Sequence, residues 1–93
     1  MIEPEHILDI VCDIFKISID SVKSSKRDRK FVRCRKAFSI ICRKKLDLSF
    51  HEIGVYINKT KSQICIYVCS QPMDEYYTSR LNFCYKKVDE LFN

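Results

Sequence analysis

The chain has 93 residues, which is enough for one domain with a modest core. Hydrophobic residues make up 46% of it, so an intrinsically disordered chain is excluded. No segment approaches the roughly 20 uninterrupted apolar residues of a membrane-spanning helix, and the acidic N-terminus lacks the basic-then-apolar order of a signal peptide. We therefore expect a soluble, cytoplasmic protein that does not contact a membrane.

The formal net charge of +5 is unevenly distributed. Residues 1–20 carry five acids and one lysine, whereas residues 21–46 carry eleven Lys or Arg against a single acid, Asp28. Residues 47–93 are nearly balanced. So dense a block of like charge repels itself unless it is solvated or matched to a polyanion. This segregation, together with the arginine content, favours a nucleic-acid partner over a merely solvated surface.

The first half of the chain predicts two long helices separated by a polar loop. Residues 5–16 repeat apolar side chains at helical spacing, and a brief helix is expected around Asp20–Lys23. Residues 24–30 contain no apolar side chain and predict the loop. Residues 33–45 return to helical spacing. The predicted inward side of this helix comprises Cys34, Ala37, Phe38, Ile41 and Cys42, and its outward side comprises Arg35, Lys36, Arg43, Lys44 and Lys45.

Two capping boxes predict a helix-turn-helix at about residues 49–70. Ser49-Phe50-His51-Glu52 opens a short helix that ends near Ile57, and Thr60-Lys61-Ser62-Gln63 opens the next one. Asn58-Lys59 forms the turn between them. The pattern by itself is weakly specific, because any short helical hairpin shows it. Phe38, Ile53, Ile57, Ile64 and Val68 are assigned to the core.

A terminal helix is predicted at about residues 73–92. Its apolar residues recur at intervals of 4, 3, 4 and 3, which makes one stripe on a helix. Packing on the chain's own core is the default for this stripe, and pairing with a second copy in a homodimer is the alternative. The chain as a whole predicts one all-α domain, residues 1–93, of five to six helices. The stripe residues are Tyr77, Leu81, Cys84, Val88 and Leu91.

The sequence offers no catalytic or metal constellation. Cys65 and Cys69 lie one helical turn apart, but no nearby histidine or second cysteine pair completes a zinc site. Two histidines, at 6 and 51, have no evident nucleophile partner, and His51 is expected to be exposed or to contact the backbone. We therefore expect no enzyme activity, no cofactor, no metal and no small-molecule substrate. Five cysteines fall within apolar helical patterns and are expected to behave as small hydrophobic residues: Cys12, Cys42, Cys65, Cys69 and Cys84.

Two runs of residues carry a more specific signal. They are Lys26-Arg27-Asp28-Arg29 to Val32-Arg33-Cys34-Arg35 and Leu48-Ser49-x-x-Glu52-Ile53-Gly54. With Ile7–Ser18, they resemble the C-terminal DNA-binding domain of the bacterial replication initiator DnaA over roughly residues 5–71. The resemblance implies a TrpR-like or DnaA-C-terminal-like helical fold. Because a phosphate-binding glycine loop is absent, the chain resembles a stand-alone binding module or a fragment.

The resemblance also implies a binding mode on double-stranded DNA. In that family the second helix of the motif enters the major groove and an arginine of the basic loop reaches the neighbouring minor groove. Arg27 falls on that arginine, and Lys59 falls on the arginine of the family's turn. The residues implied in DNA binding are Lys26, Arg27, Arg29, Arg33, Arg35, Lys59, Thr60, Lys61, Ser62 and Gln63.

The chain departs from the family at the residues with which that family recognises the DNA sequence. The family signature Asp-His-Thr/Ser-Thr is Thr60-Lys61-Ser62-Gln63 here, and the turn is one residue shorter, with Asn58 in place of a glycine pair. Gln63 has two open interpretations: pairing with adenine through both amide atoms, or folding back onto Thr60 as a cap. For each arginine a phosphate contact is the alternative to base reading. The resemblance therefore does not imply that this chain prefers the short DNA box that the initiator family recognises at a replication origin.

Two functions remain open at this point. The leading one is sequence-directed, non-enzymatic binding of double-stranded DNA in replication initiation or transcription. The alternative is a protein-interaction or dimerisation module with the same fold, such as a modulator of replication initiation, with a second copy or a replication protein as partner. The lost Asp-His signature favours this alternative, as do Tyr76, Tyr77 and Tyr85 beside the terminal stripe.

Overall fold

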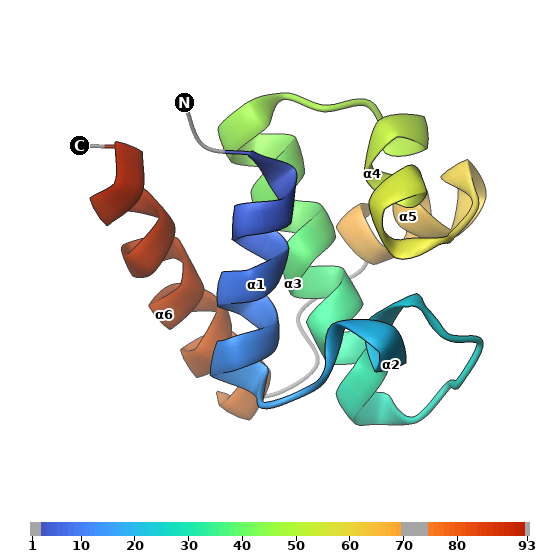
Figure 1. Cartoon of the computed structure of the whole chain (residues 1–93), viewed down its shortest axis with the longest axis horizontal. Helices are drawn as coiled ribbons and strands as arrows, with labels where there is room; N and C mark the ends of the chain where they lie inside the picture. Colours follow the sequence, from blue (N-terminus) through green and yellow to red (C-terminus); the bar gives the residue numbers. More distant parts are fainter. Residues whose placement is uncertain (1–2, 70–74, 93) are drawn as a thin grey trace.

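A computed structural model describes residues 3–69 and 75–92. These residues form six helices and no strand (Figure 1), so the predicted all-α class is confirmed. No helix in this part of the chain is long and apolar enough to cross a membrane. The helices are α1 (Pro4–Phe15), α2 (Ile19–Lys23), α3 (Arg29–Leu46), α4 (Phe50–Ile57), α5 (Lys61–Cys69) and α6 (Glu75–Phe92).

The long helix α3 lies at the centre of the arrangement. Helices α1 and α6 pack on one side of it, α4 and α5 on the other, and α2 lies against it and α1 (Figure 1). The helix begins at Arg29, whereas the sequence predicted a start at residue 33, so Arg29 and Lys30 belong to its first turn. The basic loop is therefore residues 24–28. Because the first turn of α3 is polar, periodicity alone does not reveal it.

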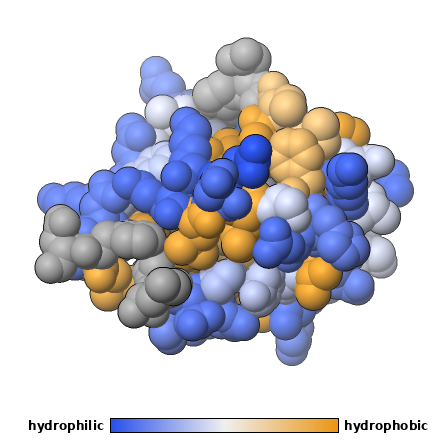
Figure 2. All heavy atoms as spheres, turned by 90° about the horizontal axis from the view of Figure 1, so that it is seen from above, coloured by the Kyte–Doolittle hydropathy of each residue, from blue (hydrophilic) through white to orange (hydrophobic). Residues whose placement is uncertain are grey.

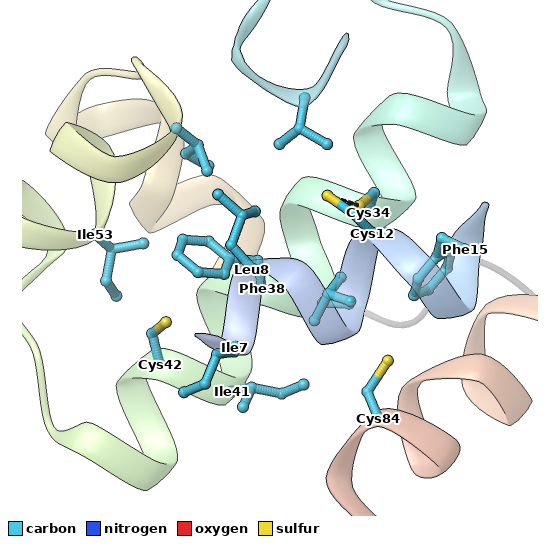
Figure 3. Packing of buried hydrophobic residues seen from close by; sticks show 14 of the residues in the cluster. Ile7, Leu8, Cys12, Phe15, Cys34, Phe38, Ile41, Cys42, Ile53 and Cys84 are labelled. Carbon is cyan, nitrogen blue, oxygen red and sulfur yellow. Dashed lines mark hydrogen bonds between the residues drawn. The ribbon is translucent and has the colours of Figure 1, made fainter. Parts of the chain in front are cut away.

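One hydrophobic core receives side chains from all six helices. In Figure 3, Leu8 of α1 and Phe38 of α3 lie together, with Ile53 of α4 to one side. The predicted core residues are buried, except Val68, which is partly buried. Removing a fully buried aromatic side chain from such a core costs about 3–5 kcal/mol of stability, so this packing holds α4 and α5 in place.

Helix α6 packs its apolar stripe on the chain's own core. Tyr77, Cys84 and Val88 are fully buried, and the rings of Phe15 in α1 and Tyr77 lie 6.3 Å apart. The prediction of own-core packing is therefore confirmed for this stripe. Leu91 is the exception: it is 57% exposed, so its assignment to the buried stripe was wrong.

Apolar side chains are not all covered. On the face seen in Figure 2, hydrophilic residues surround an apolar area near the middle of the view. All six cysteines are free thiols, and Cys12, Cys34, Cys42 and Cys84 are buried as small hydrophobic residues. Cys69 is exposed, so the expectation of a hydrophobic role fails there, because α5 turns only Ile64 fully inward. The large hydrophobic side chains that are exposed in the described chain are Val55, Ile66, Tyr76, Phe83 and Leu91.

Candidate nucleic-acid interface

Both predicted capping boxes are present in the helix-turn-helix. Ser49 Oγ accepts a hydrogen bond from the Glu52 backbone N–H at 3.2 Å, and Glu52 Oε1 accepts one from the Ser49 N–H at 3.1 Å. The bond from the Ser49 N–H lowers the pKa of the Glu52 carboxyl, because it stabilises the charged form. At the start of α5, Thr60 Oγ1 accepts from the Gln63 N–H at 3.2 Å. Both helix starts therefore follow from local hydrogen bonds.

The sequence left two roles open for Gln63, adenine pairing and helix capping, and in the structure it caps the helix. Its Oε1 accepts from the Thr60 backbone N–H at 3.0 Å and from the Thr60 hydroxyl at 3.2 Å. A carbonyl oxygen has two lone pairs, and adenine pairing requires the same oxygen to accept from the adenine amino group. In this conformation Gln63 completes the cap and has no acceptor left for adenine.

The turn between α4 and α5 depends on two residues. Asn58 adopts the left-handed conformation, with φ 57° and ψ 47°, which asparagine tolerates better than most residues. The Lys59 backbone N–H then donates to the Gly54 carbonyl at 2.9 Å. A Cβ atom at Gly54 would lie 2.3 Å from the Lys59 carbonyl oxygen. Only glycine therefore allows the turn to come this close to α4.

Arg35 is buried, and its guanidinium group caps the C-terminal end of α2. Its Nε donates to the Val22 carbonyl at 2.8 Å, and its Nη2 donates to the carbonyls of Ser24 at 2.8 Å and Ser21 at 3.2 Å. The last carbonyls of a helix have no partner within the helix, and a forked cation also suits the negative end of its dipole. Arg35 thus ties α3 to α2.

The predicted outward positions of Arg35 and Lys36 were wrong. Arg35 is 2% exposed and Lys36 is 3% exposed. The Lys36 ammonium lies 5.7 Å from the centre of the Tyr77 ring, and burial lowers its pKa. Long cationic side chains can cover apolar surface with their stems, so charge alone did not indicate which face of α3 is outside. Arg35, which the resemblance implied in DNA binding, is therefore buried, with its guanidinium group directed at the end of α2.

The turn of the motif also reaches the end of α2. Asn58 Nδ2 donates to the Lys23 carbonyl at 3.5 Å, and Lys59 Nζ donates to the Ser24 carbonyl. Burial and the positive charges of Arg35 and Arg27 lower the pKa of Lys59. The Lys59 ammonium therefore points to the start of the basic loop.

A hollow of about 240 Å³ lies between the basic loop, α3 and α5. Three of the side chains that line it are cationic, and none of its lining residues is acidic. Cations that converge without a carboxylate produce a positive potential that an anion would relieve. Tyr67 was not predicted from the sequence, although it lies four residues after Gln63 and so on the same side of α5. The lining residues are Ser25, Arg27, Val32, Arg35, Lys59, Gln63 and Tyr67.

A second, wider hollow of about 630 Å³ follows α4, the turn and the start of α5. Lys61, Ser62 and Thr60 are exposed there or beside it. Val55 is 67% exposed and Ile66 is 64% exposed, and neither was singled out from the sequence, where other apolar residues of these two helices were assigned to the core. Apolar side chains on such a surface can contact the thymine methyl group.

The remaining predicted residues divide between two sides of the molecule. Lys26 and Arg29 are exposed at the two ends of the loop–α3 junction, and the Lys26 ammonium lies 5.9 Å from the centre of the Phe31 ring. Arg33 is partly buried, and its guanidinium lies 5.5 Å from the centre of the Tyr76 ring of α6. The structure thus gathers the loop, the turn and the start of α5, and leaves Arg33 beside α6.

The chain is similar to known proteins over this part. The family model described as bacterial dnaA protein helix-turn-helix matches residues 4–71, which include α1 to α5. The chromosomal replication initiator protein DnaA of Thermosipho africanus is 35% identical over 60 residues, which are 64% of this chain and 14% of that protein. The protein of the same name from Nostoc sp. is 34% identical over 68 residues, 73% of this chain and 15% of the relative. The chain therefore spans about a seventh of the length of these relatives.

Proposed function

Because this chain belongs to the bacterial DnaA helix-turn-helix family, we propose that it binds double-stranded DNA without catalysing a reaction. Helix α5 enters the major groove, and the basic loop, residues 24–28, follows the backbone towards the neighbouring minor groove. The relatives are named as chromosomal replication initiators. We infer a role in replication initiation or in transcription control, with sequence-directed binding.

The observation that carries this proposal is the convergence of cations in the smaller hollow. Arg27 from the loop, Arg35 from α3 and Lys59 from the turn line it together. Burial, and after it the positive charges of Arg35 and Arg27, lower the pKa of Lys59, so bringing these like charges together has a cost. A DNA phosphate placed there would offset that cost, and would do so at the junction between the two parts of the surface.

The residues have different roles in this proposal. Arg27, Lys26 and Arg29 contact the backbone or the minor groove from the loop and the first turn of α3. Lys61 adds its charge to the positive end of the α5 dipole, which attracts phosphate. Ser62, in the first turn of α5, faces the bases, as the N-terminal residues of a recognition helix usually do. Arg35 and Lys59 position the loop and the turn.

The test is duplex binding followed by fluorescence anisotropy over a range of salt concentrations. About four phosphate contacts predict a slope of roughly −3 to −4 for log K against log salt. Arg27→Ala and Lys61→Ala should each weaken binding, and Lys61→Ala should reduce the slope by about 1. Lys86→Ala is the matched control, because Lys86 is an exposed lysine on α6. A protein without duplex affinity at low salt would contradict the proposal, as would an equal loss in the control.

Selection from random duplexes tests the sequence-directed part separately. An enriched motif is the expected result, and its spacing would reveal whether two copies bind side by side. Equal recovery of all duplexes would reduce the function to phosphate binding.

A second candidate function uses the outer face of α6. Tyr76 and Phe83 are about half exposed there, and with Glu75, Ser79 and Arg80 they line a shallow hollow. This helix lies outside the matched range and across the molecule from α5 (Figure 1). Exposed aromatic residues beside arginine are common at protein interfaces, so this face is the one on which a protein partner would dock. Sedimentation at high protein concentration tests whether that partner is a second copy.

A further inference from the structure

Cys65 and Cys69 form an accessible pair of thiols on α5. Their sulfur atoms lie 3.9 Å apart. Cys65 is partly exposed and Cys69 is exposed, whereas the other four cysteines are buried. In the folded protein a thiol-seeking ligand therefore meets this pair first.

What distinguishes Cys65 and Cys69 from the other cysteines is that solvent reaches them, since a short sulfur–sulfur distance also occurs elsewhere. The sulfurs of Cys12 and Cys34 are also close, at 4.0 Å. Both of those residues lie in the hydrophobic core, as Figure 3 shows, and a ligand would have to unfold the protein to reach them. Cys42 and Cys84 are buried as well, and burial raises the pKa of each thiol to about 12, so losing the proton that a metal thiolate must lose is costly there.

The helix geometry disfavours a disulfide within the pair and suits a bridging ion. Residues four apart on a helix have Cβ atoms about 5–6 Å apart, whereas a disulfide needs a Cβ separation of about 3.5–4.5 Å. With metal–thiolate bonds of about 2.3 Å, one ion can reach both sulfurs at their separation of 3.9 Å with a bent S–metal–S angle. A linear arrangement needs the sulfurs to move apart to about 4.6 Å, which is within reach of Cβ atoms about 5–6 Å apart on an intact helix.

The number of protein ligands available determines which metal ion this site can hold. Zinc in a structural site takes four protein ligands, and the described residues contain no group of three or more His, Cys, Asp or Glu side chains that could hold a metal. Monovalent copper is soft, prefers thiolates and is stable with two of them. We propose that Cys65 and Cys69 form a two-thiolate site for a soft monovalent cation of the Cu(I) class.

Binding is a ligand exchange with no redox step. Each thiol loses its proton to solvent and each sulfur donates an electron pair to the ion, so two protons leave when one Cu(I) binds. Thiols are mostly protonated at neutral pH and bind metals as thiolates, so protons compete with the ion. Affinity should fall as the pH falls. The site needs only these two side chains of α5, so it can be tested in the absence of DNA.

The test titrates Cu(I) into the reduced full chain without oxygen, against a coloured Cu(I) chelator. We expect one Cu(I) per chain, and an affinity about tenfold lower or worse in Cys65→Ser and in Cys69→Ser. Circular dichroism checks that both variants keep their helices. A wild-type chain that takes no Cu(I) from the chelator would overturn the proposal, and so would a Cys69→Ser variant that binds as tightly as the wild type.

A rescue variant tests the spacing itself. Lys61→Cys added to Cys69→Ser places a new thiol four residues before Cys65, on the same helix. If two thiols one turn apart are what the ion needs, binding returns to near the wild-type level. A rescue variant that stays as weak as Cys69→Ser would overturn the geometric argument.

Discussion

The Lys59 ammonium, in the turn of the helix-turn-helix, donates a hydrogen bond to the carbonyl of Ser24, at the start of the basic loop. The two residues are 35 positions apart in the chain. Arg35 binds the same carbonyl from α3 at 2.8 Å. The basic loop and the helix-turn-helix therefore meet at the carbonyl oxygen of Ser24. A substitution of Lys59 or Arg35 should alter the position of both parts of the proposed DNA-binding surface.

The close approach of α4 to the turn makes Gly54 intolerant of a side chain. In Gly54→Ala the new Cβ would meet the Lys59 carbonyl oxygen at 2.3 Å, so the backbone must move. We expect a loss of about 1–3 kcal/mol of stability, as for overpacked sites, measured by urea unfolding. Val55→Ala, at an exposed position of the same helix, should change stability by less than about 0.5 kcal/mol. Equal stability of Gly54→Ala and the wild type would refute the steric argument.

The fork of Arg35 cannot be replaced by a lysine. Arg35→Lys keeps the charge but loses at least one of three hydrogen bonds, and a buried carbonyl without a partner costs about 1–3 kcal/mol. Unfolding should show this loss. The duplex affinity should fall as well, because the loop is no longer held. Arg43→Lys is the matched control: Arg43 is 44% exposed in its ion pair, and such pairs contribute little. If Arg43→Lys had the larger effect, our account of Arg35 would be wrong.

At alkaline pH, DNA binding should increase the fraction of Lys59 side chains that are protonated. Its pKa in the folded protein is lowered from 10.5 by burial and by Arg35 and Arg27. Between that lowered pKa and 10.5 the unfolded chain binds more protons, so this group makes the folded protein more stable as the pH rises through the window. A phosphate in the hollow would stabilise the ammonium and raise the pKa. NMR titration of the Lys59 side chain with and without duplex checks this, and an unchanged pKa would place the phosphate elsewhere.

Gln63→Glu separates capping from DNA contact. A glutamate keeps the acceptor oxygen that Thr60 uses, so the helix cap and the thermal stability should be retained. It also brings a negative charge to a surface proposed to meet phosphate, so duplex affinity should fall, and more so at low salt. Unchanged affinity would mean that the start of α5 does not approach the DNA. Gln63→Ala, by comparison, should lower stability by about 1 kcal/mol through loss of the cap.

How far the sequence predicts the structure depends on how local each interaction is. Both helix starts of the motif were found because Ser49 with Glu52, and Thr60 with Gln63, bond within one turn. The start of α3 was missed because its first turn carries arginine and lysine, which are good helix formers but show no apolar period. Charge segregation located the basic block, and the family resemblance located the motif within the chain.

The sequence by itself determined an all-α chain, its capped motif, its terminal apolar stripe and its family. These depend on spacings of three and four residues, which a linear pattern records. Tertiary structure alone decided that Arg35 turns inward, that Lys59 holds the loop, that Arg33 faces α6 and that the thiol of Cys69 is exposed. The physical reason is that each of these depends on which unpaired carbonyl, aromatic ring or open space lies nearby. The carbonyls of α2 lie next to Arg35 and Lys59 only after six helices have packed around one core.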